Sequence, residues 1–189
     1  MKGSKLPVTG KMGNWPVVRP SGRISVEMEI EARYVIAQNA WRNTYYLLAK
    51  LYGEEMGWEK TNRILGKMWG IIGHPEVFLA LKKKFNEVKD DCVALSRILQ
   101  YEFLVEGYDI DVIEEKPGKA IIRELICPWW GDMTTRYQGV QIEEAMCGPG
   151  CIGIITNAAK AFNPQIKVER TMHIAKGDPY CEYVFTLGK

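Results

Sequence analysis

Apolar residues along the first half of the chain recur at intervals of three and four, the spacing of amphipathic helices. The pattern predicts helices over about 25–54, over about 55–72, from Pro75 through Phe85, and over about 90–106. Gly73 and Pro75 interrupt the pattern between the second and third helices, where a break is expected. The first half of the chain is therefore predicted to be helical.

After residue 107 the period changes from helical to alternating. Residues 108–126 alternate on both sides of Lys116-Pro117-Gly118, which predicts a β-hairpin. Loop and short helix are expected over 129–146, a helix over 151–163 and a closing hairpin over 165–187. This order predicts an α+β fold with a helical N-terminal half and a C-terminal antiparallel sheet of hairpins packed by helices.

The element order also suggests how the chain is divided. Residues 1–24 are rich in Pro and Gly and are predicted to form an N-terminal arm. Residues 25–189 are predicted to form a single α+β domain, with a helical part over 25–106 and a sheet-containing part over 107–189.

Composition places the chain among ordinary globular proteins. Of its 189 residues 47% are hydrophobic and 25% are charged, and the net charge is +2. Acids and bases are interspersed, without the basic stripe that a nucleic-acid binder uses, so nucleic acid is not expected as a partner. No secretory signal and no apolar run of about 20 residues is visible, so we expect a cytoplasmic protein that makes no membrane contact.

Cysteine supplies the first functional clue. The chain has five cysteines, and four of them fall in its last third: Cys127, Cys147, Cys151 and Cys181. In a reducing cytosol these are expected to be thiols, metal ligands or catalytic groups rather than disulfides.

The closing hairpin brings a histidine near one of these cysteines. His173 precedes the turn Lys176-Gly177-Asp178-Pro179, and Cys181 follows it. A loop of about five residues would put His173 opposite Cys181, with their Cβ atoms roughly 5 Å apart, where both can bind one metal ion. A loop one residue shorter would point the two side chains to opposite faces.

Further ligands lie close along the sequence. Cys147 and Cys151 flank Gly-Pro-Gly, Cys127 ends a predicted strand, and Glu144 lies three residues before Cys147. Zinc favours a tetrahedral set of Cys and His, closed in a structural site and open to water in a catalytic one. Zinc is the expected metal, with iron and an iron–sulfur site as alternatives. Ordinary packing of buried thiols and a hydrogen-bonded histidine is the other interpretation.

Without a metal, a cysteine is a candidate nucleophile. Cys127 after a strand, or Cys147 before the Gly-rich turn, could be activated by a histidine or by a helix N-terminus. A helix that begins at Cys151 would lower the pKa of a nearby thiol through its dipole. Cys127 and Cys151 are therefore the catalytic candidates.

An aromatic stretch follows Cys127. Trp129, Trp130 and Tyr137 are candidates to line an apolar ligand pocket, and Arg136 is a candidate to bind a carboxylate or hydroxyl of the ligand. The alternative is that the two tryptophans join the helical half to the sheet.

The C-terminal half resembles the L-2-amino-thiazoline-4-carboxylic acid hydrolase-like family and the related vinyl-4-reductase ligand-binding domain, the phenol-sensing module of some bacterial activators. The similarity covers roughly residues 40–187 and is carried by Cys127-Pro128, by Cys147 and by ERTMHIAKGDPYCEYVF, residues 169–185. It implies an α+β ligand-binding fold, often dimeric. It also implies ring opening of a cyclic C–N substrate in the first family and a zinc site under a small-molecule pocket in the second.

Carried over to this chain, Cys181 matches the final cysteine of the zinc motif of the sensor. His173 stands where the sensor has another cysteine, Arg170 where it has a glutamate, and Cys147 nearest an earlier cysteine. The resemblance thus implies metal ligands Cys147, His173 and Cys181, and Glu144 or Cys151 would compensate for the missing glutamate.

The sequence therefore predicts a hydrolase-like protein that binds a small molecule, has a Cys/His metal site and acts on a small cyclic amide-like substrate, as a homodimer. The alternative is a non-enzymatic sensor or binding module for a small aromatic molecule, with a structural zinc.

Overall fold

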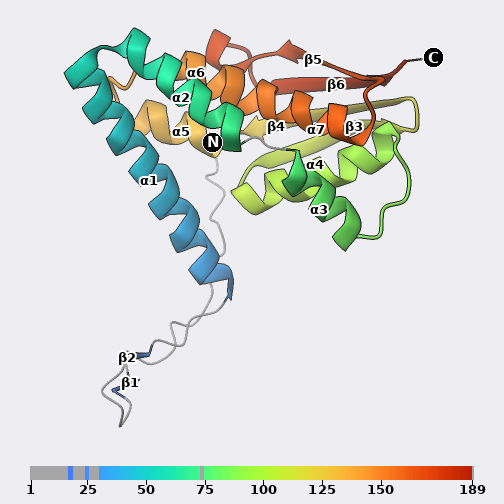
Figure 1. Ribbon diagram of the computed structural model, residues 1–189, viewed down its shortest axis with the longest axis horizontal. Coiled ribbons are helices and arrows are strands. Elements are labelled where there is room, and N and C mark those ends of the chain that lie inside the picture. Colours follow the sequence, from blue (N-terminus) through green and yellow to red (C-terminus); the bar gives the residue numbers. More distant parts are fainter. Residues whose placement is uncertain (1–16, 19–23, 26–29, 73–74, 189) are drawn as a thin grey trace. The chain divides into compact units, whose positions relative to one another are not determined.

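In the computed structural model the described residues are 17–18, 24–25, 30–72 and 75–188 (Figure 1). Contacts divide the chain into two units, 1–45 and 46–189. In the first unit β1 (Val17–Val18) pairs antiparallel with β2 (Ile24–Ser25). The rest of the predicted arm over 1–24 lies outside the described residues.

Four helices form the first half of the described chain, as predicted. They are α1 (Ile30–Met56), α2 (Trp58–Ile72), α3 (Glu76–Lys84) and α4 (Cys92–Glu106). Gly57, with φ +84°, separates α1 from α2, and Gly107, with φ +88°, ends α4. These are left-handed positions that glycine occupies without strain.

The C-terminal half forms a four-stranded antiparallel sheet in the order β3-β4-β6-β5. Its strands are β3 (Asp109–Lys116), β4 (Lys119–Ile126), β5 (Ile166–Met172) and β6 (Cys181–Leu187). The predicted α+β class, with a helical N-terminal half and a C-terminal sheet, is confirmed.

The segment between the two hairpins is more helical than expected. It contains α5 (Pro128–Thr135), α6 (Glu143–Cys147), the π-helix η1 (Gly148–Gly153) and α7 (Ile154–Phe162). The Gly-Pro-Gly between Cys147 and Cys151 lies inside η1, which joins α6 to α7. π-turns of this kind often occur at functional sites.

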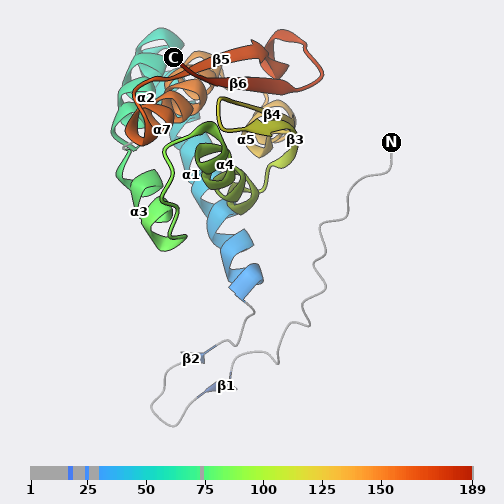
Figure 2. The same cartoon turned by 90° about the vertical axis from the view of Figure 1, so that its right-hand side faces the viewer.

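One face of the sheet holds the core. Ala120, Ile122, Tyr183 and Phe185 are fully buried on this face, in a cluster that also includes residues of α4 and α7. Figures 1 and 2 show both helices on the same side of the strands. The inward positions of β4 alternate along the strand, so residue 124 continues the buried row.

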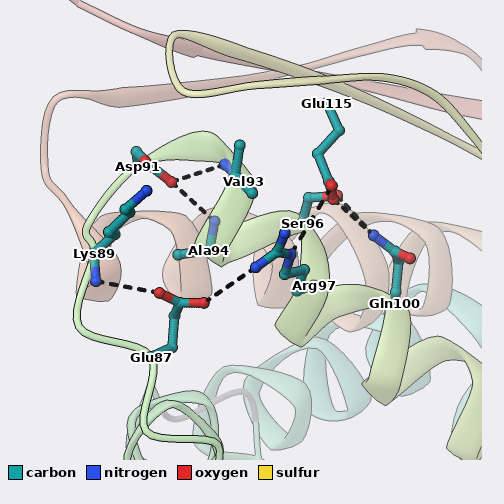
Figure 3. Close-up of polar contacts among 9 residues, drawn as sticks. All are labelled: Glu87, Lys89, Asp91, Val93, Ala94, Ser96, Arg97, Gln100 and Glu115. Atoms are coloured by element: carbon teal, nitrogen blue, oxygen red, sulfur yellow. Dashed lines mark hydrogen bonds and ion pairs between the residues drawn. The ribbon is translucent and has the colours of Figure 1, made fainter.

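Polar contacts fix the start of α4 against the first hairpin (Figure 3). The carboxylate of Asp91 accepts hydrogen bonds from the backbone N–H groups of Val93 and Ala94, both at 3.0 Å, which caps the helix. Gln100 donates to Glu115 of β3 at 3.0 Å. Since α4 also carries Glu102 and Glu106, these contacts position two acidic side chains over the sheet.

No helix in the described part of the chain is long and apolar enough to cross a membrane.

Candidate functional site

A cavity lies within the unit formed by residues 46–189, between the inner face of the sheet and helices of the same unit. The space open to the centre of a water-sized molecule is about 70 Å³, and one water needs only about 10–15 Å³ of it. The cavity is lined mainly by apolar side chains, from Trp69, Phe78, Leu99, Phe103, Tyr108, Trp129, Trp130, Met146, Ile154, Ile155 and Ile174. It is therefore large enough for a small organic molecule.

Glu124 is the buried polar group of this cavity. It continues the inward row of β4, is only 1% exposed and lines the cavity. Its Oε2 accepts a hydrogen bond from the hydroxyl of Tyr183 at 3.3 Å, whereas its Oε1 is buried and has no hydrogen-bond partner among the described residues. Burial raises the pKa of the Glu124 carboxyl to about 8. At neutral pH this side chain is mainly a carboxylic acid with one oxygen available to a ligand.

Four of the five cysteines surround the same cavity: Cys127, Cys147, Cys151 and Cys181. Strand ends supply Cys127 and Cys181, and the α6–η1 segment supplies the other two. The fold thus brings the four thiols to one cavity, although they come from elements far apart along the chain.

Burial raises the pKa of each of these thiols, that of Cys147 to about 12. The proximity of Glu124 adds to the rise in pKa for all four. Cys151 Sγ also lies 2.8 Å from the hydroxyl of Tyr183. The thiolate is the nucleophilic form of cysteine, so this environment disfavours the nucleophilic role predicted for Cys127 and Cys151.

The register of the closing hairpin separates His173 from the cavity. Arg170 pairs with Tyr183, but Met172 pairs with Glu182, so the strand has a bulge at this point. His173 follows the strand and precedes the short 3-10 helix η2 (Ile174–Lys176). Cys181 lines the cavity, where its Sγ accepts from the backbone N–H of Ile174 at 3.4 Å, whereas His173 is not among the lining residues.

His173 is nonetheless buried, with 7% of its surface exposed. Its two ring nitrogens have no hydrogen-bond partner, and its backbone N–H donates to Asp178 Oδ2 at 2.7 Å. Burial lowers the pKa of the imidazole, and Arg170 lowers it further. The ring is therefore held in its neutral form.

The predicted metal ligands are not gathered into one set. In the described part of the chain, no three side chains of His, Cys, Asp or Glu form a group that could hold a metal ion. Glu144 is exposed on α6 and does not line the cavity. Arg170 lines the cavity and donates from Nη1 to the carbonyl of Cys147 at 2.9 Å. Burial raises the pKa of the Cys147 thiol more than the positive charge of Arg170 lowers it.

The predicted substrate-binding residues divide into two groups. Trp129 and Trp130 line the cavity. Arg136 forms an ion pair with Asp132 at 3.5 Å and its side chain is 57% exposed, whereas Tyr137 stacks on Tyr46 with ring centroids 4.8 Å apart. Neither Arg136 nor Tyr137 is among the cavity-lining residues.

Three acidic residues of the cavity were not predicted: Glu102, Glu106 and Glu124. Glu124 could have been found, because it falls in phase with Ala120 and Ile122 at a position where the strand pattern favours an apolar side chain. Glu102 and Glu106 are one helical turn apart on α4, and such pairs usually face solvent. Only the packing of α4 on the sheet shows that these two reach the cavity.

Comparison with known proteins is informative at the level of the fold. No family model matches the chain, and no curated protein matches its sequence. Among solved structures, the chain is similar to the phenol-responsive sensory domain of the transcription activator PoxR with phenol, at 13% identity and a TM-score of 0.51, over 87% of this chain and 77% of that one. It is also similar to trafficking protein particle complex subunit 3 from Naegleria fowleri covalently bound to palmitic acid, at 18% identity and a TM-score of 0.47, over 82% of this chain and 96% of that one. The first of these likenesses shows that the chain shares its fold with the sensory domain.

Proposed function

We propose that this protein is a small-molecule-binding module whose ligand is a ring-sized, mainly apolar compound held in the cavity beside Glu124. The observation that carries the proposal is the buried and unpartnered Oε1 of Glu124 in an otherwise aromatic and aliphatic cavity. A buried polar atom without a partner destabilises the protein, and a ligand that hydrogen-bonds to it removes that penalty. The fold shared with a phenol-responsive sensory domain supports the same function.

Binding is favoured over hydrolysis by the state of the thiols. All four cysteines at the cavity have a raised pKa, and His173, the nearest candidate base by sequence, does not line it. The thiolate is the nucleophilic form of cysteine, and the raised pKa keeps these thiols protonated at neutral pH. The proposal therefore follows the non-enzymatic alternative rather than the hydrolase.

We expect small ring compounds such as phenol and cyclic amides to raise the melting temperature. A ligand at 100 times its Kd stabilises a protein by about 2.7 kcal/mol, which is roughly 5–10 °C for a chain of this length. The control is Ile154→Phe, which adds a ring at the cavity wall and should reduce the shift. If no ring compound shifts the melting temperature, or if this variant responds as the wild type does, the binding proposal is wrong.

Zinc uptake stays a prediction of the sequence, and the proposed binding function does not depend on it. Zinc and iron are measured by mass spectrometry in protein never exposed to chelator. About one equivalent of zinc that is lost in the variant Cys147→Ser/Cys181→Ser would support the prediction. Less than about a tenth of an equivalent would contradict it.

A homodimer is likewise proposed rather than shown. Support comes from α1, where Leu47, Leu48 and Leu51 are each more than two-fifths exposed, since contiguous exposed apolar residues often mark protein interfaces. Sedimentation velocity tests the proposal: we expect a dimer that Leu47→Glu/Leu51→Glu converts to a folded monomer. A wild-type monomer throughout the micromolar range would refute it.

A further inference from the structure

The acidic groups of the cavity indicate the charge of its ligand. Three glutamates line the cavity, together with a single arginine. Glu102 and Glu106 lie one turn apart on α4, and Glu124 faces them from β4. Glu106 is close enough to raise the pKa of both other carboxyls. Acidic side chains that repel one another in an apolar cavity form a site that is stabilised by a positive charge.

Two of these carboxyls, those of Glu102 and Glu124, lack an ion pair in the described part of the chain. Glu124 Oε1 also has no hydrogen-bond partner there, although it is fully buried. Burial raises the pKa of Glu124 overall, and Arg170 is near enough to lower it. The guanidinium of Arg170 nevertheless donates to the carbonyl of Cys147 and forms no ion pair with Glu124 among the described residues. The Oε1 atom of Glu124 is therefore available to a ligand in the cavity, and a bound cation would favour the ionised carboxylate.

The remaining walls also suit a cation. Trp69, Trp129, Trp130, Phe103 and Tyr108 all line the cavity. The faces of aromatic rings attract cations, tryptophan most strongly, and cages of aromatic residues recognise quaternary ammonium ligands. The same rings accommodate the apolar body of a ligand.

We propose that the ligand is a small protonated amine on a ring or short apolar body, with its ammonium group bound by Glu124 and Glu102 among the tryptophans. This inference rests on the proposed binding function and narrows its ligand class. An ammonium group has three donors, enough for Glu124 Oε1 and for a second carboxylate at once.

Three compounds of one shape and different charge test the inference: benzylamine, benzyl alcohol and benzoate, titrated calorimetrically into the full chain. We expect benzylamine to bind about tenfold or more tightly than benzyl alcohol, as a charge-assisted hydrogen bond implies. Glu124→Gln and Glu102→Gln should each lower the affinity for benzylamine by about tenfold. The affinity for benzyl alcohol should stay within about threefold of the wild-type value. The matched control is Glu144→Gln, which removes an exposed charge on α6 and should change the affinity for neither compound.

The outcomes separate this inference from the binding function. If benzyl alcohol binds as tightly as benzylamine, or if both glutamine variants bind benzylamine normally, the amine class is wrong and the cavity still binds ligands. If benzoate binds best, Arg170 recognises an anion and the amine class is again wrong. If none of the three compounds binds and other ring compounds also fail to do so, both proposals fall.

Discussion

Replacing Glu124 by Gln is expected to stabilise the protein by about 5 kcal/mol at pH 9 while changing its stability little near pH 4. The folded protein holds the pKa of this carboxyl at about 8, mainly through burial, against an ordinary value of 4.5. Below pH 4.5 both the folded and the unfolded states carry the proton, so the carboxyl imposes no charge penalty. As the pH rises from 4.5 to 8 the unfolded state ionises first, and the folded state becomes progressively less favourable.

Urea unfolding of both proteins at about pH 4, 6 and 9 measures this difference. The amide that Glu124→Gln introduces retains an acceptor for the hydroxyl of Tyr183 but cannot ionise, so only the pH-dependent part of the stability is removed. Glu144→Gln is the matched control, because that side chain is exposed on α6. Stability curves of wild type and Glu124→Gln that run parallel from about pH 4 to about pH 9 would show that Glu124 ionises normally in the fold.

The same carboxyl explains how the site can be both unstable and functional. A buried acid with a raised pKa destabilises the free protein at physiological pH unless something offsets its cost. A ligand that donates to Oε1 would do so. We therefore expect a ligand that donates to Oε1 to reduce the difference between wild type and Glu124→Gln at about pH 9, because it binds the carboxylate more tightly than the amide.

Local patterns predicted the fold well because each element carries its own signal. The helical period ends where glycine adopts a positive φ, and the alternation begins immediately after Gly107. The hairpin at Lys116-Pro117-Gly118 and the closing hairpin appear as predicted. The sequence pattern could not show the bulge near Thr171. One extra residue there does not disturb the alternation of apolar and polar residues along the sequence, but it shifts the pairing of β5 with β6.

The site was predicted only in part, for a related reason. Cysteine is rare and chemically distinctive, so four thiols in one third of the chain drew attention to residues that line one cavity. Glutamate is common and usually exposed, so there was no reason from the sequence to place Glu102 and Glu106 of α4 at the cavity. Arg136 and Tyr137 were candidates because their residue types suit a ligand, but they contact Asp132 and Tyr46 instead. The proximity that makes a site comes from packing, which sequence spacing does not encode.

Of the two adjacent tryptophans, Trp129 is expected to matter for folding and Trp130 for binding. Trp129 is 5% exposed and packs edge-on against Trp69 with ring centroids 5.4 Å apart. Its indole N–H donates to Glu106 Oε2 at 3.2 Å, and its carbonyl accepts from the hydroxyl of Tyr46 at 2.5 Å. Trp130 is only half-buried, although it also lines the cavity.

Trp129→Ala should therefore lower the free energy of unfolding by about 3–5 kcal/mol, the usual loss for a buried aromatic residue. Because a typical domain is stable by only about 5–15 kcal/mol, this variant is expected to be partly unfolded at about 37 °C. Trp129→Phe retains a ring against Trp69 but loses the bond to Glu106, and should fall between Trp129→Ala and wild type. Chemical denaturation followed by circular dichroism measures all three.

Trp130→Ala is the informative counterpart, because it removes the same side chain one position along the helix. We expect this variant to lose less than about 2 kcal/mol of stability, because a partly exposed ring buries less surface. We also expect its affinity for ring-shaped ligands to fall by about tenfold. If Trp130→Ala destabilises the protein as much as Trp129→Ala does, the two rings share one structural role. If instead it leaves ligand affinity unchanged, its ring is not part of the binding surface, and the aromatic wall of the cavity is formed by residues that the fold itself requires.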